Sequence, residues 1–275
     1  MGDAHVRWTL ERPGGHRLIG DDSGGDGETI LLLHGLTATR RYVLHGSRLL
    51  ERQGYRLISY DARGHGESDP APQHTAYDYR SLTDDALAVL DARGVDRAVL
   101  AGHSMGSHTA VALALAHPDR VAALVLGAPA HLGRPTEEPE RWDRLADGLR
   151  TGGVEGFYDA IVDKGPPEWH ERLRRVVLQR MERHLHRDAV ADALTWTPRS
   201  TAFDGMAALD GVRAPTLIVA TRDTFDADHP YAVAMRYRDH IAGSVTVTEP
   251  EGSPPLTWRG GALSAEIAGF LASRG

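Results

Sequence analysis

The segment from residue 98 to residue 116 constrains the fold more than any other part of the chain. An apolar run at its start is followed by Gly102-His103-Ser104-Met105-Gly106 and then by a helical run of small residues. A chain that passes directly from a strand into a helix needs a sharp turn, whose central residue adopts a backbone conformation that residues other than glycine avoid. Strand and helix then pass close together, so the flanking positions must lack bulk, as glycine does. The pattern therefore predicts a strand, a tight turn at Ser104 and a helix.

The same turn predicts a reactive hydroxyl group. A G-x-S-x-G sequence between a strand and a helix is typical of the nucleophile elbow, in which the turn lifts the serine oxygen above the edge of a sheet. The amides at the start of the following helix favour negative charge that develops beside that oxygen. We therefore interpret Ser104 as a nucleophile or a ligand-facing residue, against the alternative of an ordinary tight turn.

Apolar runs and helical patterns alternate along most of the chain. This alternation predicts an α/β protein with a mostly parallel, eight-stranded sheet that helices cover on both faces. The predicted strands are residues 29–33, 55–60, 97–101, 121–126, 215–220 and 245–248, with an N-terminal hairpin at 6–10 and 17–19. The predicted helices are residues 42–53, 81–93, 107–116, 231–241 and 262–273.

Residues 133–208 break this rhythm, because they show helical periodicity and no clear strand. Helical patterns lie at 139–150, 169–185 and 188–194. An insert of this kind between two strands predicts a lid over the carboxyl edge of the sheet, which shapes a substrate pocket and excludes water. The alternative is an ordinary helical subdomain. The expected division is a core of residues 1–132 and 209–275 and a lid of 133–208. The aromatic residues of the lid are candidates either for lining the pocket or for its core: Trp142, Phe157, Trp169 and Trp196.

Composition narrows the functional classes. The chain has 275 residues, of which 41% are hydrophobic and 25% charged, as in a soluble globular protein. The net charge of −7 and the lack of a basic block argue against nucleic acid or an anionic membrane surface as a partner. Cysteine is absent, which excludes disulfides, zinc–thiolate sites and cysteine nucleophiles.

Localisation and cofactors are inferred from what the sequence lacks. No apolar stretch has the length of a signal-peptide core or a membrane span, so we expect a cytoplasmic protein. The chain shows neither a P-loop nor a G-x-G-x-x-G fingerprint, and its histidines lack a recognisable metal-site spacing. We expect no cofactor, no metal and a small-molecule substrate as the partner, and leave open a homodimer.

Four motifs in this order resemble those of the α/β-hydrolase family, and the resemblance covers nearly the whole chain. It implies an α/β-hydrolase fold with a serine nucleophile. The motifs are Leu31-Leu32-Leu33-His34-Gly35-Leu36, Asp61-Ala62-Arg63-Gly64-His65-Gly66-Glu67-Ser68, the segment Gly102–Gly106, and the late strand Pro215–Ala220 with the following Thr221-Arg222-Asp223.

The resemblance implies a role for each motif. Ser104 attacks a carbonyl carbon after a neighbouring imidazole removes its proton. The backbone N–H groups of Met105 and Leu36 would hold the tetrahedral oxyanion, with His34 and Gly35 forming the loop that presents Leu36. One such donor is typically worth about 3 kcal/mol in the transition state.

Asp223, at the end of the late strand, would orient and support that imidazole. Asp226 and Asp228 stand close by in the sequence and are alternatives for this role, and a solvated loop carboxylate is the structural alternative for Asp223.

The remaining motif residues are expected to support the loops. We expect Asp61, Arg63 and Ser68 to brace a loop, and His34 and His65 to form hydrogen bonds with the backbone near the sheet edge. His103, at the first variable position of the elbow, is expected to pack away from the substrate.

The chain departs from the family in the loop after the last strand, which normally carries the catalytic histidine. Residues 249–258 contain no histidine. In a first explanation, His229 serves as the base, because it lies six positions after Asp223 on the loop that follows the late strand, and a triad is defined by geometry rather than by chain order. The alternative for His229 is a histidine at the start of a helix that bonds to the backbone. His131 is a weaker candidate for the base, and His240 is expected at the surface or in packing.

Two further explanations stay open. The fold could run non-hydrolytic chemistry, such as a cyclisation, elimination or decarboxylation, with Glu249 or Glu251 as acid or base. It could also bind a ligand without turnover. The leading hypothesis is a serine hydrolase that acts on an ester, thioester or similar acyl bond in a small, fairly apolar molecule.

Overall fold

The computed structural model describes residues 5–164, 167, 170–222, 228–250 and 253–274. Within these residues, eight strands form one sheet in the order β1-β2-β4-β3-β5-β6-β7-β8. The β1–β2 and β2–β4 pairs are antiparallel and all other neighbours are parallel, which confirms the predicted fold class. The strands are β1 (Val6–Glu11), β2 (Arg17–Asp22), β3 (Thr29–Leu33), β4 (Arg56–Tyr60), β5 (Ala98–His103), β6 (Val121–Gly127), β7 (Thr216–Ala220) and β8 (Val245–Thr248).

The central strands are buried on both faces. Every residue of β3 and β7 is buried, as their unbroken apolar sequences predict for the middle of a parallel sheet. In the register of the sheet, Leu31 of β3 lies opposite Ile58 of β4 and Leu100 of β5. The carboxyl ends of β3 and β5 therefore lie side by side, and the loops that follow them meet at one edge.

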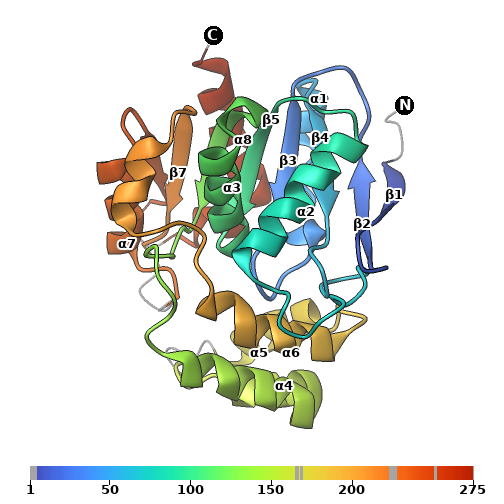
Figure 1. The fold of residues 1–275 in the computed structure, drawn as a ribbon. Coiled ribbons are helices and arrows are strands. Elements are labelled where there is room, and N and C mark those ends of the chain that lie inside the picture. Colours follow the sequence, from blue (N-terminus) through green and yellow to red (C-terminus); the bar gives the residue numbers. More distant parts are fainter. Residues whose placement is uncertain (1–4, 165–166, 168–169, 223–227, 251–252, 275) are drawn as a thin grey trace.

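Helices cover both faces of the sheet (Figure 1). On one face, α2, α3 and α7 pack their apolar side chains against the strands, and on the other face α1 and α8 do so. The five helices are α1 (Leu49–Arg52), α2 (Tyr79–Ala92), α3 (Met105–Ala116), α7 (Tyr231–His240) and α8 (Gly260–Ala272).

The helix predicted at residues 42–53 is wrong for most of its length. The structure has a 3₁₀ turn at Arg40–Tyr42 and a single helical turn at Leu49–Arg52. Between them His45 and Gly46 adopt positive φ angles of 48° and 78°, which an α-helix does not allow. The periodic apolar positions in this stretch reflect burial of the loop residues Val43 and Leu44 rather than a continuous helix.

Among the described residues, three α-helices lie between β6 and β7, at the end of the sheet to which the parallel strands run (Figure 1). They pack around their own apolar cluster, separate from the clusters on the two faces of the sheet. We call this segment the helical layer; it comprises α4 (Pro139–Asp159), α5 (His170–Met181), α6 (Arg187–Trp196) and their connections. Within α4 the backbone of Gly153 is not helical, with φ 61° and ψ −147°.

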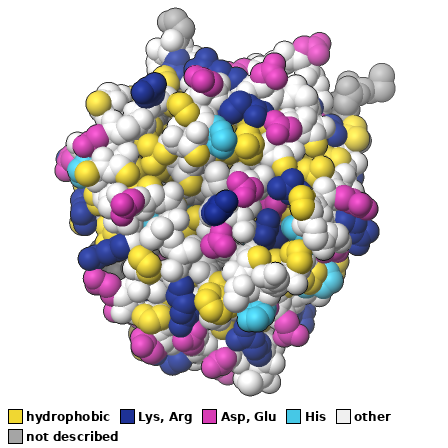
Figure 2. All heavy atoms as spheres, in the orientation of Figure 1, with side chains coloured by type: hydrophobic (Ala, Val, Ile, Leu, Met, Phe, Trp, Pro, Cys, Tyr) yellow, Lys and Arg dark blue, Asp and Glu magenta, His cyan; other side chains and the backbone are white. Residues whose placement is uncertain are grey.

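Leu36, in the loop after β3, joins the helical layer to the core. Its half-buried side chain packs against the cluster of the helical layer and also against two smaller clusters, one around Met105 and one around Tyr77. The surface itself has no dominant sign of charge on the face drawn in Figure 2, where acidic and basic side chains are interspersed. No helix among the described residues has the length and apolarity to cross a membrane.

Candidate active site

The turn between β5 and α3 has the strained geometry that the sequence predicts. Ser104 adopts φ 50° and ψ −116°, a region that residues other than glycine rarely occupy. A Cβ atom on Gly102 would lie 2.2 Å from the carbonyl oxygen of Gly106, and one on Gly106 would lie 2.1 Å from that of Leu33. Both positions therefore require glycine. At Gly102 the strand β5 approaches the backbone of α3, and at Gly106 the helix α3 approaches the backbone of β3.

The hydroxyl of Ser104 is directed to His229 rather than to the helix. Ser104 is the N-cap of α3, but its side chain makes no capping hydrogen bond, although serine commonly does so at this position. Its Oγ lies 2.8 Å from Nε2 of His229. Its backbone N–H donates to the carbonyl of Gly127 at the end of β6, which fixes the turn to the sheet.

His229 comes from the loop between β7 and α7, and Pro230 follows it as the N-cap of α7. The preceding residue, Asp228, forms an ion pair with Arg141 in the first turn of α4. The structure thus brings His229 to the nucleophile, while Asp228 is engaged by the helical layer. Asp223 and Asp226, the other candidates for the acid, lie outside the described residues, so the identity of the acid stays a prediction.

The loop after β3 lies directly beside the nucleophile. A Cβ atom on Gly35 would be 3.5 Å from Cβ of Ser104 and 3.2 Å from Nδ1 of His103, so this position favours a residue without a side chain. Met105 is the first residue of α3, and the N–H groups of a first helical turn have no acceptor within the helix. This placement suits Leu36 and Met105 as main-chain oxyanion donors, a role that stays a prediction.

His34 and His65 contact the backbone, as the sequence analysis expects. Nε2 of His34 accepts from the N–H of Ala62 at 2.9 Å, and Nδ1 donates to the carbonyl of Gly35 at 2.8 Å. Burial holds the pKa of His34 well below its usual value. His65 places Nε2 2.5 Å from the carbonyl oxygen of Leu36, and burial lowers its pKa also.

Asp61, Arg63 and Ser68 brace the loop after β4. The fully buried carboxylate of Asp61 accepts from the backbone N–H of Arg40 and pairs with its guanidinium. Arg63 forms two hydrogen bonds of 2.8 Å with Asp85 of α2. The Ser68 hydroxyl donates to the carbonyl of Asp61 at 2.6 Å. Arg40 has no signal in the sequence, because no motif marks it and its partners lie 19 to 27 positions away.

The other histidines considered as bases are engaged elsewhere. Nε2 of His131 accepts from the backbone N–H of Ala202 at 3.1 Å, and burial lowers its pKa to about 4. The suggestion that His131 is the base is therefore wrong, because its one acceptor nitrogen is occupied by the main chain. His240 pairs with Asp210 at the surface, as expected.

His103 lies between the loop of His229 and the loop after β3. Its ring lies 5.7 Å from that of His229 between centroids, and its Nδ1 faces Gly35. The side chain thus lies where the elbow meets the loop after β3, and whether it faces the substrate stays a prediction.

Glu249, at the end of β8, does not have the setting of an acid or base. Its buried carboxylate accepts from the backbone N–H groups of Arg222 and Leu256, and from the hydroxyl of Thr221 at 3.3 Å. These bonds tie the loop after β7 to the loop after β8. We therefore correct the proposed acid–base role of Glu249 to a bracing role; Glu251 lies outside the described residues.

The aromatic residues proposed to line a pocket serve mainly as core. Phe157 is buried inside the cluster of the helical layer, and Trp142 packs against that cluster. Trp196 packs with Tyr77 and contacts the ring of His74. Of the two alternatives for Phe157, a core residue is the one found, because its ring fills the interior of the helical layer. Trp169 lies outside the described residues.

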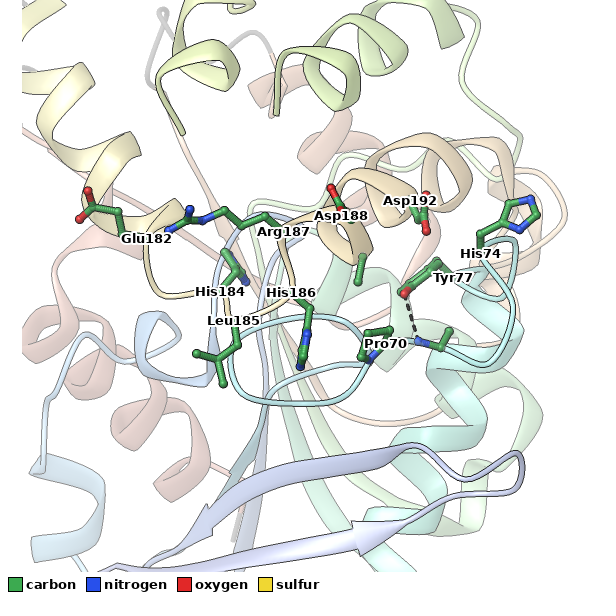
Figure 3. Close-up of a pocket in the computed structure, with 12 residues that line it drawn as sticks. Pro70, His74, Tyr77, Glu182, His184, Leu185, His186, Arg187, Asp188 and Asp192 are labelled. Atoms are coloured by element: carbon green, nitrogen blue, oxygen red, sulfur yellow. Dashed lines mark hydrogen bonds between the residues drawn. The ribbon is translucent and has the colours of Figure 1, made fainter. Parts of the chain in front are cut away.

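A surface groove of about 780 Å³ lies where the helical layer meets the loop at residues 70–77 (Figure 3). His184, His186 and Tyr77 are among its lining residues, whereas Ser104 and His229 are not. The groove is thus separate from the nucleophile.

Comparison with known proteins shows which fold family the chain resembles. Residues 28–230 match the model of the alpha/beta hydrolase fold family. A putative carbamate hydrolase RutD of Variovorax paradoxus is 31% identical over 219 residues, which cover 78% of this chain and 80% of that protein. 2-Hydroxy-6-oxononadienedioate/2-hydroxy-6-oxononatrienedioate hydrolase 2 of Pseudomonas putida is 32% identical over 213 residues, or 74% and 73% of the two chains. The crystal structure of the enol-lactonase of Burkholderia xenovorans LB400 aligns with a TM-score of 0.78 at 24% identity, covering 96% of this chain and 99% of that one.

Proposed function

We propose that this chain, which belongs to the α/β-hydrolase fold family, is a serine hydrolase that cleaves an ester, thioester or similar acyl bond in a small, fairly apolar molecule. The proposal depends on one observation, the 2.8 Å contact between Oγ of Ser104 and Nε2 of His229 at a strained elbow. The relatives are named for hydrolysis of small molecules, which supports an enzyme of the hydrolase class.

The first half of the reaction acylates Ser104. His229 accepts the hydroxyl proton at Nε2 while Oγ forms a bond to the carbonyl carbon of the substrate. The carbonyl oxygen becomes negative and is held by the N–H groups of Met105 and Leu36. The bond to the leaving group then breaks, and His229 returns the proton to the leaving oxygen or sulfur.

The second half releases the acid product. Water gives a proton to Nε2 of His229 as its oxygen attacks the acyl carbon, and the same two amides hold the second oxyanion. The bond between the acyl carbon and Oγ then breaks, and His229 returns the proton to Oγ, which regenerates Ser104. The other ring nitrogen, Nδ1, is where the acid of the triad binds, and Asp223 is our candidate because it stands three positions after the last residue of β7 in the sequence. The acid keeps the ring in the tautomer that leaves Nε2 unprotonated.

The helical layer is proposed to act as the lid over this site. Its residues Arg141 and His184 contact the loop of His229 and the loop after β3, the two loops that carry the proposed base and one oxyanion donor. The side chain of Leu36 packs against the apolar cluster of the layer, which supports an apolar lining at that point. A cytoplasmic location and a homodimer remain expectations from the sequence.

A fluorophosphonate probe tests the proposal, because it phosphonylates only a serine that a base activates. We expect stoichiometric labelling of Ser104 by peptide mass spectrometry, and turnover of p-nitrophenyl acetate and butyrate by the same protein. Ser104→Ala should abolish labelling, and His229→Ala should slow it by a factor of 10³ or more, on the order of the loss of a triad member. His240→Ala removes a surface imidazole and is the matched control. Unchanged labelling of His229→Ala would contradict the relocated base, and an unlabelled wild-type protein would favour the non-hydrolytic or ligand-binding alternatives.

A further inference from the structure

Three successive carbonyl oxygens of the loop after β3 each face an imidazole nitrogen. The carbonyl of Gly35 lies 2.8 Å from Nδ1 of His34, and that of Leu36 lies 2.5 Å from Nε2 of His65. The carbonyl of Thr37 lies 3.3 Å from Nε2 of His184. The three rings form a column, with centroids 5.2 Å apart between His34 and His65 and 5.6 Å apart between His65 and His184.

Each ring is buried, at 3%, 1% and 2% exposure in that order, so water does not compete for these contacts. His184 accepts at Nδ1 from the backbone N–H of Gly66 at 2.9 Å. A neutral imidazole has one donor and one acceptor nitrogen, so the proton of His184 must be on Nε2, which then donates to Thr37. The same reasoning puts the proton of His34 on Nδ1, because its Nε2 accepts from Ala62.

His65 differs because both of its ring nitrogens face carbonyl oxygens, Nδ1 that of Arg63 at 2.9 Å and Nε2 that of Leu36. A neutral ring donates to only one of them. Since the contact to Leu36 is the shorter, we expect the proton on Nε2.

His184 belongs to the helical layer, in the connection between α5 and α6, and Figure 3 shows it at the groove beside Leu185 and His186. The backbone N–H of Leu185 also donates to the carbonyl of Gly66 at 2.9 Å. The helical layer is therefore attached by hydrogen bonds to two loops at once, the loop after β4 through Gly66 and the loop after β3 through Thr37.

We propose that His65 and His184 are positioning residues for the oxyanion hole: their Nε2–H groups hold the main chain of Leu36 and Thr37, and through His184 the helical layer sets the orientation of the Leu36 N–H. This inference rests on the proposed function, in which that N–H holds the oxyanion. The Leu36 N–H shares its rigid peptide plane with the carbonyl of Gly35, which His34 contacts, and the carbonyls of Leu36 and Thr37 belong to the next two planes along the chain. Contacts that fix these two planes limit rotation about the backbone bonds of Leu36 and Thr37, and so limit the orientations open to the plane that carries the Leu36 N–H. Neither histidine touches the substrate in this arrangement.

Paired amide substitutions test the proposal atom by atom. A glutamine side-chain nitrogen reaches the place of Nε2, whereas an asparagine amide reaches only the place of Nδ1. His65→Gln and His184→Gln thus keep the donor toward Leu36 or Thr37, and His65→Asn and His184→Asn lose it. With p-nitrophenyl butyrate we expect the glutamine variants to keep kcat within about threefold, and the asparagine variants to lose about tenfold in kcat with KM unchanged, part of the 10²–10³ that a whole oxyanion donor is worth. Glutamine and asparagine variants that are folded and equally active, or equally impaired, would overturn the proposal.

A measurement on the unaltered protein keeps the inference testable if an asparagine variant does not fold. Long-range ¹H–¹⁵N spectra report which imidazole nitrogen carries the proton. We expect the proton on Nε2 for His184 and His65 and on Nδ1 for His34 near pH 7.5; a proton on Nδ1 of His184 or His65 would refute the hydrogen bonds that carry the argument. This measurement requires no turnover, so it separates a failure of the positioning proposal from a failure of the hydrolase proposal, which the fluorophosphonate probe reports.

Discussion

Acid should destabilise this protein through its buried histidines, and His184 allows the effect to be calculated. Its ring is 2% exposed, and burial lowers its pKa to about 3 from 6.5. A base whose pKa is depressed in the folded state binds fewer protons when folded than when unfolded. The free energy of unfolding is therefore unaffected above the unfolded pKa of 6.5, falls as the pH drops below it, and stops falling near pH 3.

The magnitude follows from proton linkage. Each pH unit within that window costs about 1.4 kcal/mol for one histidine, so His184 alone costs about 2 kcal/mol between pH 7.5 and pH 5. Burial also lowers the pKa of His131 to about 4, which adds about 2 kcal/mol over the same interval. The sum of about 4 kcal/mol is a large part of the 5–15 kcal/mol by which a domain is typically stable.

Urea unfolding followed by circular dichroism at pH 7.5, 6.5, 5.5 and 5.0 checks this prediction. His184→Gln and His131→Gln should each reduce the loss of unfolding free energy on acidification by about 2 kcal/mol, because each removes one proton taken up on unfolding. His74→Gln, which removes an exposed imidazole, is the control. If His184→Gln lost as much stability between pH 7.5 and pH 5 as the wild type, the buried neutral state of His184 would be refuted.

Three further predictions concern the residues that hold the site. Gly106→Ala should abolish both fluorophosphonate labelling and a cooperative thermal transition, because the added Cβ atom would lie 2.1 Å from the carbonyl oxygen of Leu33. A folded, labelled variant would contradict this close approach of α3 to β3. Arg40→Gln should cost about 3–5 kcal/mol in urea unfolding, since it leaves the fully buried Asp61 without its counter-charge, and a loss below about 1 kcal/mol would argue against the pair. Glu249→Ala should lower the free energy of unfolding by about 3 kcal/mol, because it leaves two backbone N–H groups without an acceptor. Glu249→Gln should lower it by less, and an equal loss in the two variants would refute the bracing role.

The buried central strand β3 begins and ends where predicted, because its pattern reflects burial alone. The edge strand β8 also has the predicted bounds, although none of its residues is buried, and the other strands differ by one to three residues at an end. A central parallel strand is apolar at every position, so it can be predicted without knowing which strands lie beside it. The predicted helix at 42–53 failed because burial of a loop against α8 produces the same apolar spacing as a helix; a Cβ atom on Gly260 would lie 2.0 Å from the carbonyl oxygen of Leu44.

The site was predictable where its chemistry is local and not where it depends on long-range contacts. The elbow at Ser104 is specified by residues within two positions of it, and His229 was reached because it shares a loop with the expected acid. His184 has no such signal: it stands in a polar, helical stretch, and its partners Thr37 and Gly66 lie 147 and 118 positions away. Only the docking of the helical layer onto the loops brings these atoms together.

The contacts around Glu249 indicate why a base from another loop is compatible with this fold. In the family pattern that the sequence resembles, the loop after the last strand carries the catalytic histidine. Here the end of β8 carries Glu249, whose carboxylate is occupied by Arg222, Thr221 and Leu256 and holds the two post-strand loops together. The loop after β7 is thereby anchored at its start by Glu249, and it is anchored near its end by the pair of Asp228 with Arg141, directly before His229. Two anchors on one loop limit the positions of His229. Its Nε2 can therefore stay 2.8 Å from Oγ of Ser104, although the loop after β8 supplies no histidine.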